Sequence, residues 1–159
     1  MNASEIRLGE AGVADLDAVM EVMEDSFDPR FGEAWTAPQF AGLLPMPGVW
    51  LVLAREGADA VGFALARIIA DEAELLLLAV RRDSQCRGIG KMLLRRFETE
   101  AKTRGATRLH LEVRQGNHAV KLYEDTGFRL VGRRRNYYSG HDGCCYDALT
   151  LAKGAPGRD

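Results

Sequence analysis

The sequence predicts an α/β fold of the mixed-sheet (α+β) kind, with elements in the order β-α-α-β-β-β-α-β-α-β-β. Residues 75–80 form an almost continuous apolar run, which is typical of a strand covered on both faces. The segment after Gly90 has the apolar spacing of an amphipathic helix, and strand patterns lie on both sides of it. With 159 residues, the chain is the size of one domain. We expect that domain over residues 1–152, followed by a short tail at 153–159.

The N-terminal part is predicted to contain one strand and two helices. Residues 4–8 form the first strand, and a helix follows from Val13. The apolar face of this helix, at three- and four-residue steps, consists of Leu16, Val19, Met20 and Met23. Thr36 and Pro38 are typical of the cap and first turn of a second, short helix, which ends before Pro45.

The middle of the chain supplies most of the predicted sheet. Two strands, at residues 49–54 and 60–69, are separated by a polar turn at 56–59. The apolar run described above is the next strand, and the amphipathic helix after Gly90 ends near Gly105. The apolar positions of that helix are Leu93, Leu94, Phe97 and Ala101.

The C-terminal part is predicted to hold three strands and a short helix. Residues 109–114 alternate between apolar and polar side chains, as in a strand with one face of each kind. A short helix is expected at 119–123. Residues 128–138 and 146–151 then form a hairpin about the segment 139–143, where Asp-Gly is a good turn former.

The charge balance argues against nucleic acid as a ligand. The chain has 21 Lys and Arg against 23 Asp and Glu, a net charge of −2, whereas nucleic-acid-binding proteins favour a strongly basic face. Residues 81–96 nevertheless form a basic patch whose only acid is Asp83. Its basic residues are Arg81, Arg82, Arg87, Lys91, Arg95 and Arg96. Such a local patch suits a small anionic ligand.

The sequence predicts neither a membrane span nor an export signal. The longest apolar runs are far shorter than the roughly 20 residues of a membrane-spanning helix. The first residues lack a basic start followed by an apolar stretch. We therefore expect a cytoplasmic protein that does not bind membranes.

The cysteines predict neither disulfides nor a metal site. Their number is three, which is odd, and no export signal accompanies them. His141 lies close to Cys144 and Cys145, but no second ligand pair follows at zinc-finger spacing. We expect no metal.

The most informative stretch is the loop between the apolar strand and the amphipathic helix. It contains two closely spaced glycines, Gly88 and Gly90. Glycines allow a ligand to approach the backbone closely, and the amides at a helix start favour bound phosphate. The spacing matches neither the Walker pattern nor the dinucleotide fingerprint. It predicts a pyrophosphate site, with a tight turn and a solvated arginine cluster as the alternative.

Two motifs resemble those of the GCN5-related N-acetyltransferase (GNAT) family. Gln85-x-x-Gly88-x-Gly90 after an apolar strand resembles the family's acetyl-CoA motif, and residues 122–128 resemble its Leu-Tyr-Glu-x-x-Gly-Phe signature. The likeness spans about residues 6–151 and is greatest to the ribosomal-protein-alanine N-acetyltransferase (RimI-like) group. The features that point to this group are residues 71–73, 111–114 and 135–138, with Asp142 and Gly143 following. The resemblance implies the GNAT fold, with a splayed central sheet, and acetyl transfer from acetyl-CoA to an amine.

The resemblance also implies where acetyl-CoA would lie. The backbone contacts of the pantetheine arm would be Leu78, Ala79 and Val80. The pyrophosphate would be held by the backbone amides of Cys86, Arg87, Gly88, Ile89, Gly90 and Lys91. Side chains of Arg82, Arg87 or Lys91 would screen the phosphates, and the spacing leaves open which of them does so.

Acetyl transfer needs a neutral amine, a route for its proton and an acid for the departing thiolate. By the resemblance, Glu112 matches the general base, acting through water, and Tyr123 matches the acid. A phenol with an ordinary pKa of about 10 stays protonated at neutral pH and can supply that proton. From the residues alone, the alternatives are a surface glutamate at 112, paired with Arg114 or Lys121, and a core tyrosine at 123, packed on Phe128.

Three further positions carry implied roles. Asn117 matches a residue that contacts the cofactor, although it lies one residue closer to Tyr123 than in similar sequences. Tyr137 and Tyr138 match a pair that walls the acceptor groove; cross-strand packing is the alternative, and strand alternation would direct only one of them into the groove. The arginine run 133–135 is predicted to be a solvated strand end.

The resemblance implies that the acceptor is the N-terminal α-amine of a protein, with a small-ribosomal-subunit protein expected. An α-amine has a pKa of about 8 and lysine about 10.4, so roughly one α-amine in ten is neutral at pH 7, against fewer than about one lysine in a thousand. Because residues 30–48 match the RimI-like pattern poorly, a GNAT enzyme acting on a small-molecule amine or a lysine side chain is one alternative. The other is a non-catalytic acyl-CoA-binding sensor, against which the presence of both Glu112 and Tyr123 speaks.

Overall fold

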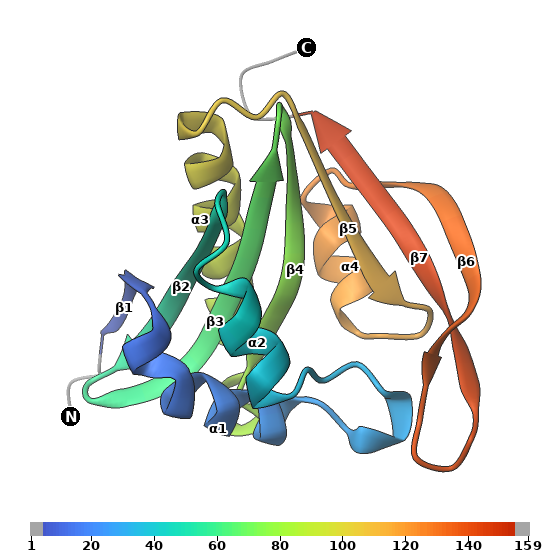
Figure 1. The fold of residues 1–159 in the computed structure, drawn as a ribbon, viewed down its shortest axis with the longest axis horizontal. Coiled ribbons are helices and arrows are strands. Elements are labelled where there is room, and N and C mark those ends of the chain that lie inside the picture. Colours follow the sequence, from blue (N-terminus) through green and yellow to red (C-terminus); the bar gives the residue numbers. More distant parts are fainter. Residues whose placement is uncertain (1–4, 155–159) are drawn as a thin grey trace.

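The computed structural model describes residues 5–154 as a seven-stranded sheet with helices on both faces (Figure 1). The strand order across the sheet is β1-β2-β3-β4-β5-β7-β6. The strands are β1 (Ile6–Ala11), β2 (Val49–Glu56), β3 (Asp59–Ile69), β4 (Glu72–Val80), β5 (Arg108–Arg114), β6 (Arg129–Ser139) and β7 (Cys145–Gly154). The helices are α1 (Leu16–Ser26), α2 (Ala37–Leu43), α3 (Ile89–Thr103) and α4 (Ala119–Asp125).

The predicted order of helices and strands is confirmed, and the differences lie at element ends. The first strand extends to Ala11, because its whole length pairs with β2; the first residue of the expected 4–8 segment lies outside the described residues. The last strand continues to Gly154, which still pairs with Arg108 of β5. The end of the domain stays a prediction, since residues 155–159 are not described.

The helices begin and end where the local sequence directs. Thr36 accepts a hydrogen bond from the Gln39 backbone N–H at 3.3 Å, and the Gln39 side chain accepts one from the Thr36 N–H at 2.8 Å. This reciprocal cap, with Pro38 in the first turn, confirms the predicted start of α2. The 15 residues of α3 make the longest helix of the described part. Across residues 5–154, no helix combines the length and apolar character that a membrane crossing requires.

The sheet opens between β4 and β5. These strands run parallel and are paired only as far as Leu75 opposite Leu111. Beyond that point β4 stays paired with β3 through Val80, and β5 stays paired with β7 through Arg114. Each strand therefore remains part of its own half while a gap widens between them (Figure 1). The splayed central sheet implied by the resemblance is confirmed.

A β-bulge at Leu76 marks the place where the gap begins. The neighbouring residues Leu65 and Ala66 of β3 lie opposite Leu77 and Leu75, so Leu76 is the extra residue. Before the bulge, Leu75 packs in the core beneath α3; after it, Leu77 packs in the core beneath α1 and α2. The bulge therefore reverses which face each later side chain occupies.

Two hydrophobic cores, one on each face, hold the sheet rigid. One face is covered by α1 and α2, which contribute Val19, Val22, Met23 and Phe40. The other face is covered by α3 and α4, and the α3 residues buried there are Leu93, Leu94, Phe97 and Ala101. These four are the positions predicted from the helical spacing. Residues of β4 contribute to both cores, so the prediction that the 75–80 strand is covered on both faces is confirmed.

Candidate active site

A cavity of about 930 Å³ lies between the diverging ends of β4 and β5. Its volume is typical of small-molecule sites. The predicted site residues that line it are Leu78, Ala79, Val80, Cys86, Gly88, Ile89, Gly90, Lys91, Glu112, Asn117, Tyr123, Tyr137 and Tyr138. Arg87 is the exception, because its guanidinium is turned to the carboxylate of Glu56 and donates two hydrogen bonds to it. The cofactor, catalytic and acceptor positions predicted from sequence thus converge on one cavity.

The loop 86–91 presents backbone N–H groups that bond to nothing in the protein backbone. Among residues 5–154, no main-chain carbonyl accepts a hydrogen bond from any of these amides. Gly88 precedes the first residue of α3 with a φ of 83°, and no side chain caps the helix there. Cys86 also has a positive φ, of 62°. The N–H groups and the positive end of the α3 dipole are therefore free to bind an anion.

The end of β4 next to this loop is fixed in place yet open on one side. The Val80 carbonyl accepts hydrogen bonds from Ser26 Oγ and Gln85 Nε2, each at 3.0 Å. Gln85 of the glycine motif therefore shapes the loop. On the side of β5, β4 has no strand partner after Leu75. The pantetheine contacts expected along this edge stay a prediction.

Glu112 lies on the polar face of β5, and its carboxylate reaches the cavity. Its side chain is 17% exposed, and one carboxylate oxygen forms an ion pair with Arg134 Nε at 2.9 Å. The predicted alternative, in which Glu112 pairs with Arg114 or Lys121, is therefore wrong. Arg114 lies on the same strand but pairs with Glu33. The carboxylate is held by a cation from β6, two strands away in the sheet.

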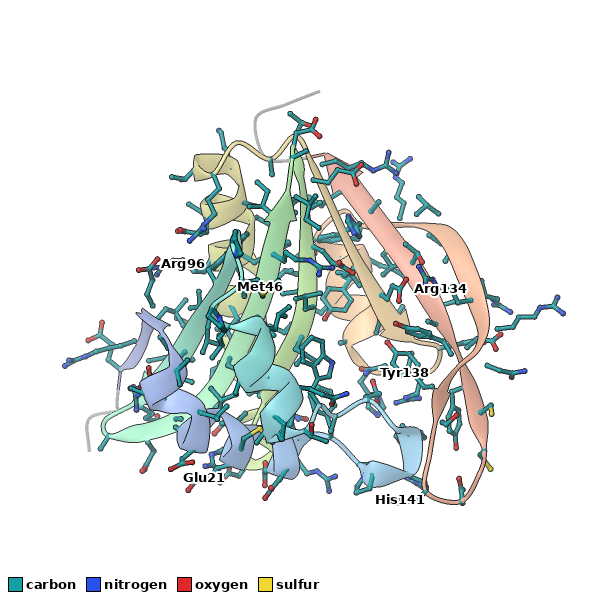
Figure 2. The ribbon with its side chains drawn as sticks, in the orientation of Figure 1. Glu21, Met46, Arg96, Arg134, Tyr138 and His141 are labelled. Atoms are coloured by element: carbon teal, nitrogen blue, oxygen red, sulfur yellow. The ribbon has the colours of Figure 1, made fainter. Side chains whose placement is uncertain are left out.

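The arginine run 133–135 is exposed to solvent, as predicted, but it does not lie at a strand end. It lies within β6, which continues to Ser139. Arg133 pairs with Asp147 of β7 at 3.6 Å, and Arg134 reaches Glu112. The Arg134 guanidinium also lies 5.4 Å from the centre of the Tyr137 ring. Figure 2 shows Arg134 and Tyr138 on the β6 side of the open end of the sheet. Arg134 therefore belongs to the candidate site.

Tyr123 is a buried residue of the core that also lines the cavity. Its side chain is 5% exposed, and its ring packs edge-on against Phe128 with 6.0 Å between ring centres. It also lines the cavity. Burial, with smaller contributions from Tyr138 and Glu33, raises the pKa of the Tyr123 phenol above its ordinary value. The hydroxyl is therefore protonated throughout the neutral range.

Tyr137 and Tyr138 both line the cavity, although strand alternation predicted that only one would. The reason is an irregularity in β6 between Arg134 and Tyr138. Within it, Asn136 has a φ of 53°, and its N–H donates to the Asp147 carboxylate at 3.0 Å. The two rings meet edge to face with 5.0 Å between their centres. Burial and the charges of nearby glutamates raise the pKa of Tyr138.

Asn117 lines the cavity, but its side chain is already bonded within the protein. Its amide nitrogen donates to Glu33 at 2.7 Å, and its oxygen accepts from the N–H of Ala119, the first residue of α4, at 2.8 Å. The cofactor contact implied by the resemblance stays a prediction. What the structure shows is a cap for the helix that carries Tyr123.

Sequence reasoning missed Glu33 and the role of Arg114. The Glu33 carboxylate accepts from Arg114 Nε at 3.0 Å, and both side chains are only 10% exposed. The Arg114 guanidinium lies 3.7 Å from the centre of the Phe31 ring. Glu33 belongs to the connection between α1 and α2, residues 27–36, which carries no recognisable motif. Only the contacts reveal it.

Two glycines hold this connection against the hairpin of β6 and β7. A side-chain carbon at Gly32 would overlap the carbonyl of Ser139, and one at Gly140 would overlap the carbonyl of Arg30. Gly32 also has a φ of 68°, which favours glycine. The connection 27–36 therefore packs backbone to backbone on the hairpin and closes one side of the cavity.

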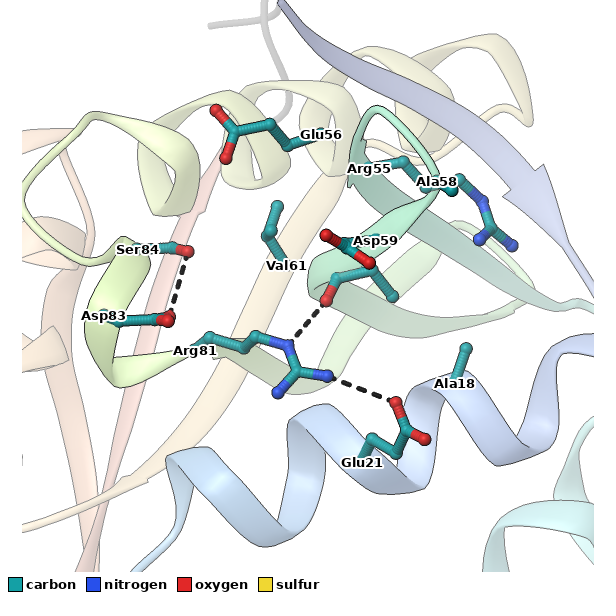
Figure 3. A pocket seen from close by; sticks show the side chains of 11 residues that line it. Ala18, Glu21, Arg55, Glu56, Ala58, Asp59, Val61, Arg81, Asp83 and Ser84 are labelled. Carbon is teal, nitrogen blue, oxygen red and sulfur yellow. Dashed lines mark hydrogen bonds and ion pairs between the residues drawn. The ribbon is translucent and has the colours of Figure 1, made fainter. Parts of the chain in front are cut away.

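A smaller pocket, of about 420 Å³, lies between α1 and the turn joining β2 to β3 (Figure 3). Arg81 donates to the Ala60 carbonyl at 2.7 Å and to Glu21 at 3.3 Å, and Ser84 donates to Asp83 at 3.2 Å. Arg81 thus pairs with Glu21 within the pocket, whereas Arg55 and Glu56 pair with Asp15 and Arg87, which do not line it. Within the described chain, no group of three His, Cys, Asp or Glu side chains is placed to hold a metal.

A splayed mixed sheet with free amides at a helix start defines a known class of protein. The chain belongs to the acetyltransferase (GNAT) family, whose sequence model matches residues 16–128. It is similar to the [ribosomal protein bS18]-alanine N-acetyltransferase of Salmonella typhimurium, with 44% identity over 94 residues, or 57% of this chain. The matched stretch spans 64% of the length of that relative, less than two thirds.

Solved structures agree over nearly the whole chain. The ribosomal-protein-S18-alanine N-acetyltransferase from Escherichia coli is 30% identical with a TM-score of 0.84, over 95% of this chain and 94% of that one. Arabidopsis thaliana NAA60 in complex with acetyl-CoA has a TM-score of 0.81 at 19% identity, over 96% and 100% of the two chains. The second likeness shows the fold alone.

Proposed function

We propose that this protein transfers the acetyl group of acetyl-CoA to the N-terminal α-amine of a protein, with an alanine-leading ribosomal protein as the acceptor. One observation carries the proposal: the unbonded amides of the 86–91 loop open into the same cavity as Glu112 and Tyr123. The names of the relatives, which act on a ribosomal-protein alanine, support the choice of acceptor.

The cofactor end of the cavity fits a nucleotide thioester. Backbone N–H groups at residues 86–91 would bind the pyrophosphate, and the edge of β4 left open beyond Leu75 would take the arm. Lys91 and Arg82 line the cavity and would screen the phosphates, whereas Arg87 is paired with Glu56. When bound, acetyl-CoA supplies the activated acetyl group.

Two side chains would move the protons. Glu112 would accept the proton of the attacking amine through a water molecule, and Tyr123 would give its proton to the departing thiolate. The buried Tyr123 hydroxyl keeps its proton at neutral pH because its pKa is raised. Arg134 would compete with a cationic amine for Glu112, because its guanidinium already pairs with that carboxylate.

The experiment measures CoA release by the whole chain with three kinds of amine. These are alanine-leading peptides, peptides whose only amine is an internal lysine, and simple polyamines. We expect turnover with the alanine-leading peptides above all, since an α-amine is far more often neutral at pH 7 than a lysine.

Each other outcome selects an alternative. Reaction with polyamines alone would replace the protein acceptor by a small molecule, and reaction with lysine peptides alone would replace it by a side chain. Binding of acetyl-CoA without acetylation of any amine would favour a sensor. A mass increase of one acetyl group at the peptide N-terminus is the direct confirmation.

A further inference from the structure

Glu33 joins two parts of the molecule that are distant in the sequence. It lies in the 27–36 connection, and both its carboxylate oxygens accept hydrogen bonds from the end of β5 and the turn after it. One accepts from Arg114 Nε at 3.0 Å, and the other from Asn117 Nδ2 at 2.7 Å. The carboxylate thus fastens the acceptor side of the cavity to the turn that leads into α4.

The contacts of the Glu33 carboxylate are buried, and the groups that make them are hydrogen-bonded. Glu33 and Arg114 are each 10% exposed. Arg114 also donates from Nη1 to the Gln115 carbonyl at 3.1 Å, and its guanidinium stacks on Phe31. A buried ion pair is stable only when its remaining polar atoms are bonded, and the loss of one partner leaves an uncompensated charge. The position of Glu33 is therefore fixed by the fold.

From Glu33 the contacts lead to Tyr123. Glu33 sets the orientation of the Asn117 amide, because only the nitrogen can donate to the carboxylate. The Asn117 oxygen is then turned to the N–H of Ala119, where α4 begins. His118, the residue before that, gives no side-chain cap. Tyr123 lies one turn further along this seven-residue helix.

We propose that Glu33 is a positioning residue for acetyl transfer, which holds the Asn117 cap of α4 and thereby places the Tyr123 hydroxyl in the cavity. The proposal deepens the function proposed above and rests on it for its kinetic readout. The charge of Glu33 also contributes to the raised pKa of both Tyr123 and Tyr138, as expected of a carboxylate close to the two hydroxyls.

The test is a reciprocal exchange of carboxylate and amide. In Glu33→Gln the single amide oxygen is taken by Arg114, which can only donate, so the new amide nitrogen faces the amide nitrogen of Asn117. In Asn117→Asp two carboxylates face each other, so each single change breaks the bond. In the double variant Glu33→Gln/Asn117→Asp, the new amide donates to the new carboxylate, which still accepts from the Ala119 N–H. The hydrogen bond is restored with its direction reversed and the net charge unchanged.

Two readouts are measured on the full chain. We expect each single variant to lower kcat about tenfold, the effect of one lost hydrogen bond to a charged group, with a smaller change in KM for the amine. Hydrogen exchange over residues 116–125 should accelerate by a similar factor. The double variant should be faster than either single variant and recover both readouts in part, because the hydrogen bond to residue 117 returns while Arg114 keeps an amide in place of a carboxylate. Glu24→Gln, an exposed glutamate of α1, is the matched control and should change neither.

The outcomes separate this proposal from the proposed function. A double variant as slow as the worse single variant, or α4 exchange that is unchanged by Glu33→Gln, overturns the positioning role. A parent protein that acetylates no amine overturns the proposed function. In that case the hydrogen-exchange pattern still decides whether Glu33 holds α4.

Discussion

The two ends of the cavity are built differently. The cofactor end, residues 76–91, offers backbone: unbonded amides at the start of α3 and the open edge of β4. The acceptor end, formed by the 27–36 connection, β5 and β6, offers side chains in ion pairs. Glu33 pairs with Arg114, and Glu112 with Arg134.

The difference indicates how each end of the cavity responds to amino-acid substitutions. A site made of backbone groups depends on glycine positions and strand ends, so most side-chain substitutions leave its binding unchanged. A site made of paired side chains depends on each partner, because a missing partner leaves a buried charge or an unfilled bond. Four substitutions test this contrast, beginning with the largest expected effect.

At the cofactor end, Gly88→Val should weaken acetyl-CoA binding by roughly a thousandfold, equivalent to two or three hydrogen bonds to a charged group. A Cβ placed on Gly88 meets no protein atom within 4 Å, so the added side chain would project into the space in front of the loop. Isothermal titration with acetyl-CoA measures the effect. Gly105→Val, with a similar φ of 94° and equally open surroundings at the far end of α3, carries the same backbone strain and should leave binding intact. Equal affinities in both variants would remove the phosphate site from this loop.

At the acceptor end, Glu112→Gln should lower turnover by about several hundredfold at pH 6, within the range of general-base catalysis. The loss should shrink above pH 8, where an α-amine is largely neutral without help. Rates of CoA release across that pH range measure the effect, and the exposed Glu124→Gln on α4 is the control. A loss that is the same at every pH would assign Glu112 a structural role.

Tyr123→Phe should lower turnover by about a hundredfold, at the lower end of the range for acid catalysis because water can replace the phenol. The ring packing on Phe128 survives, so the melting temperature should stay close to that of the parent. The raised pKa keeps the phenol protonated, and the parent rate should therefore not fall between pH 8 and pH 10 through loss of this proton. A melting temperature that drops as steeply as the rate would indicate a core residue only.

The smallest effect is expected for Arg134→Gln. The Arg134 side chain is 63% exposed, and exposed ion pairs contribute little, so KM for a cationic acceptor should fall by only about two- to fivefold as Glu112 becomes available. Its neighbour Arg135→Gln provides the matched control on the same strand. A rise in KM specific to Arg134→Gln would show that the arginine orients Glu112 instead of competing for it.

The contrast also explains what the sequence could predict. Cofactor-end residues were predictable because their signals are local: an apolar strand, two glycines and a helix within one short stretch. The helical face of α3 and the cap of α2 were predictable for the same reason. Acceptor-end pairs were not, since Glu33 and Arg114 are far apart in the chain and neither carries a local pattern.

Irregular backbone in β6 explains the predictions about its side chains that were wrong. The alternation rule failed at Tyr137 and Tyr138 because β6 departs from regular pairing beside Asn136. The alternation rule also gave no indication of the contact made by Arg134, whose side chain reaches a strand that is not adjacent to β6. A period of two detects a strand, but it does not detect the residues at which the strand departs from that period.

The bulge at Leu76 makes the length of β4 as important as its composition. Removal of Leu76 would restore simple alternation and leave Leu77 and Ala79 on the face covered by α1, because Leu75 and Leu77 already lie opposite consecutive residues of β3. Insertion of one more residue there would turn Leu77 and Ala79 toward α3, and both cores would be mismatched at once. A strand made almost entirely of leucine and alanine can accept many exchanges of one apolar residue for another, yet it has no room for a longer version of itself.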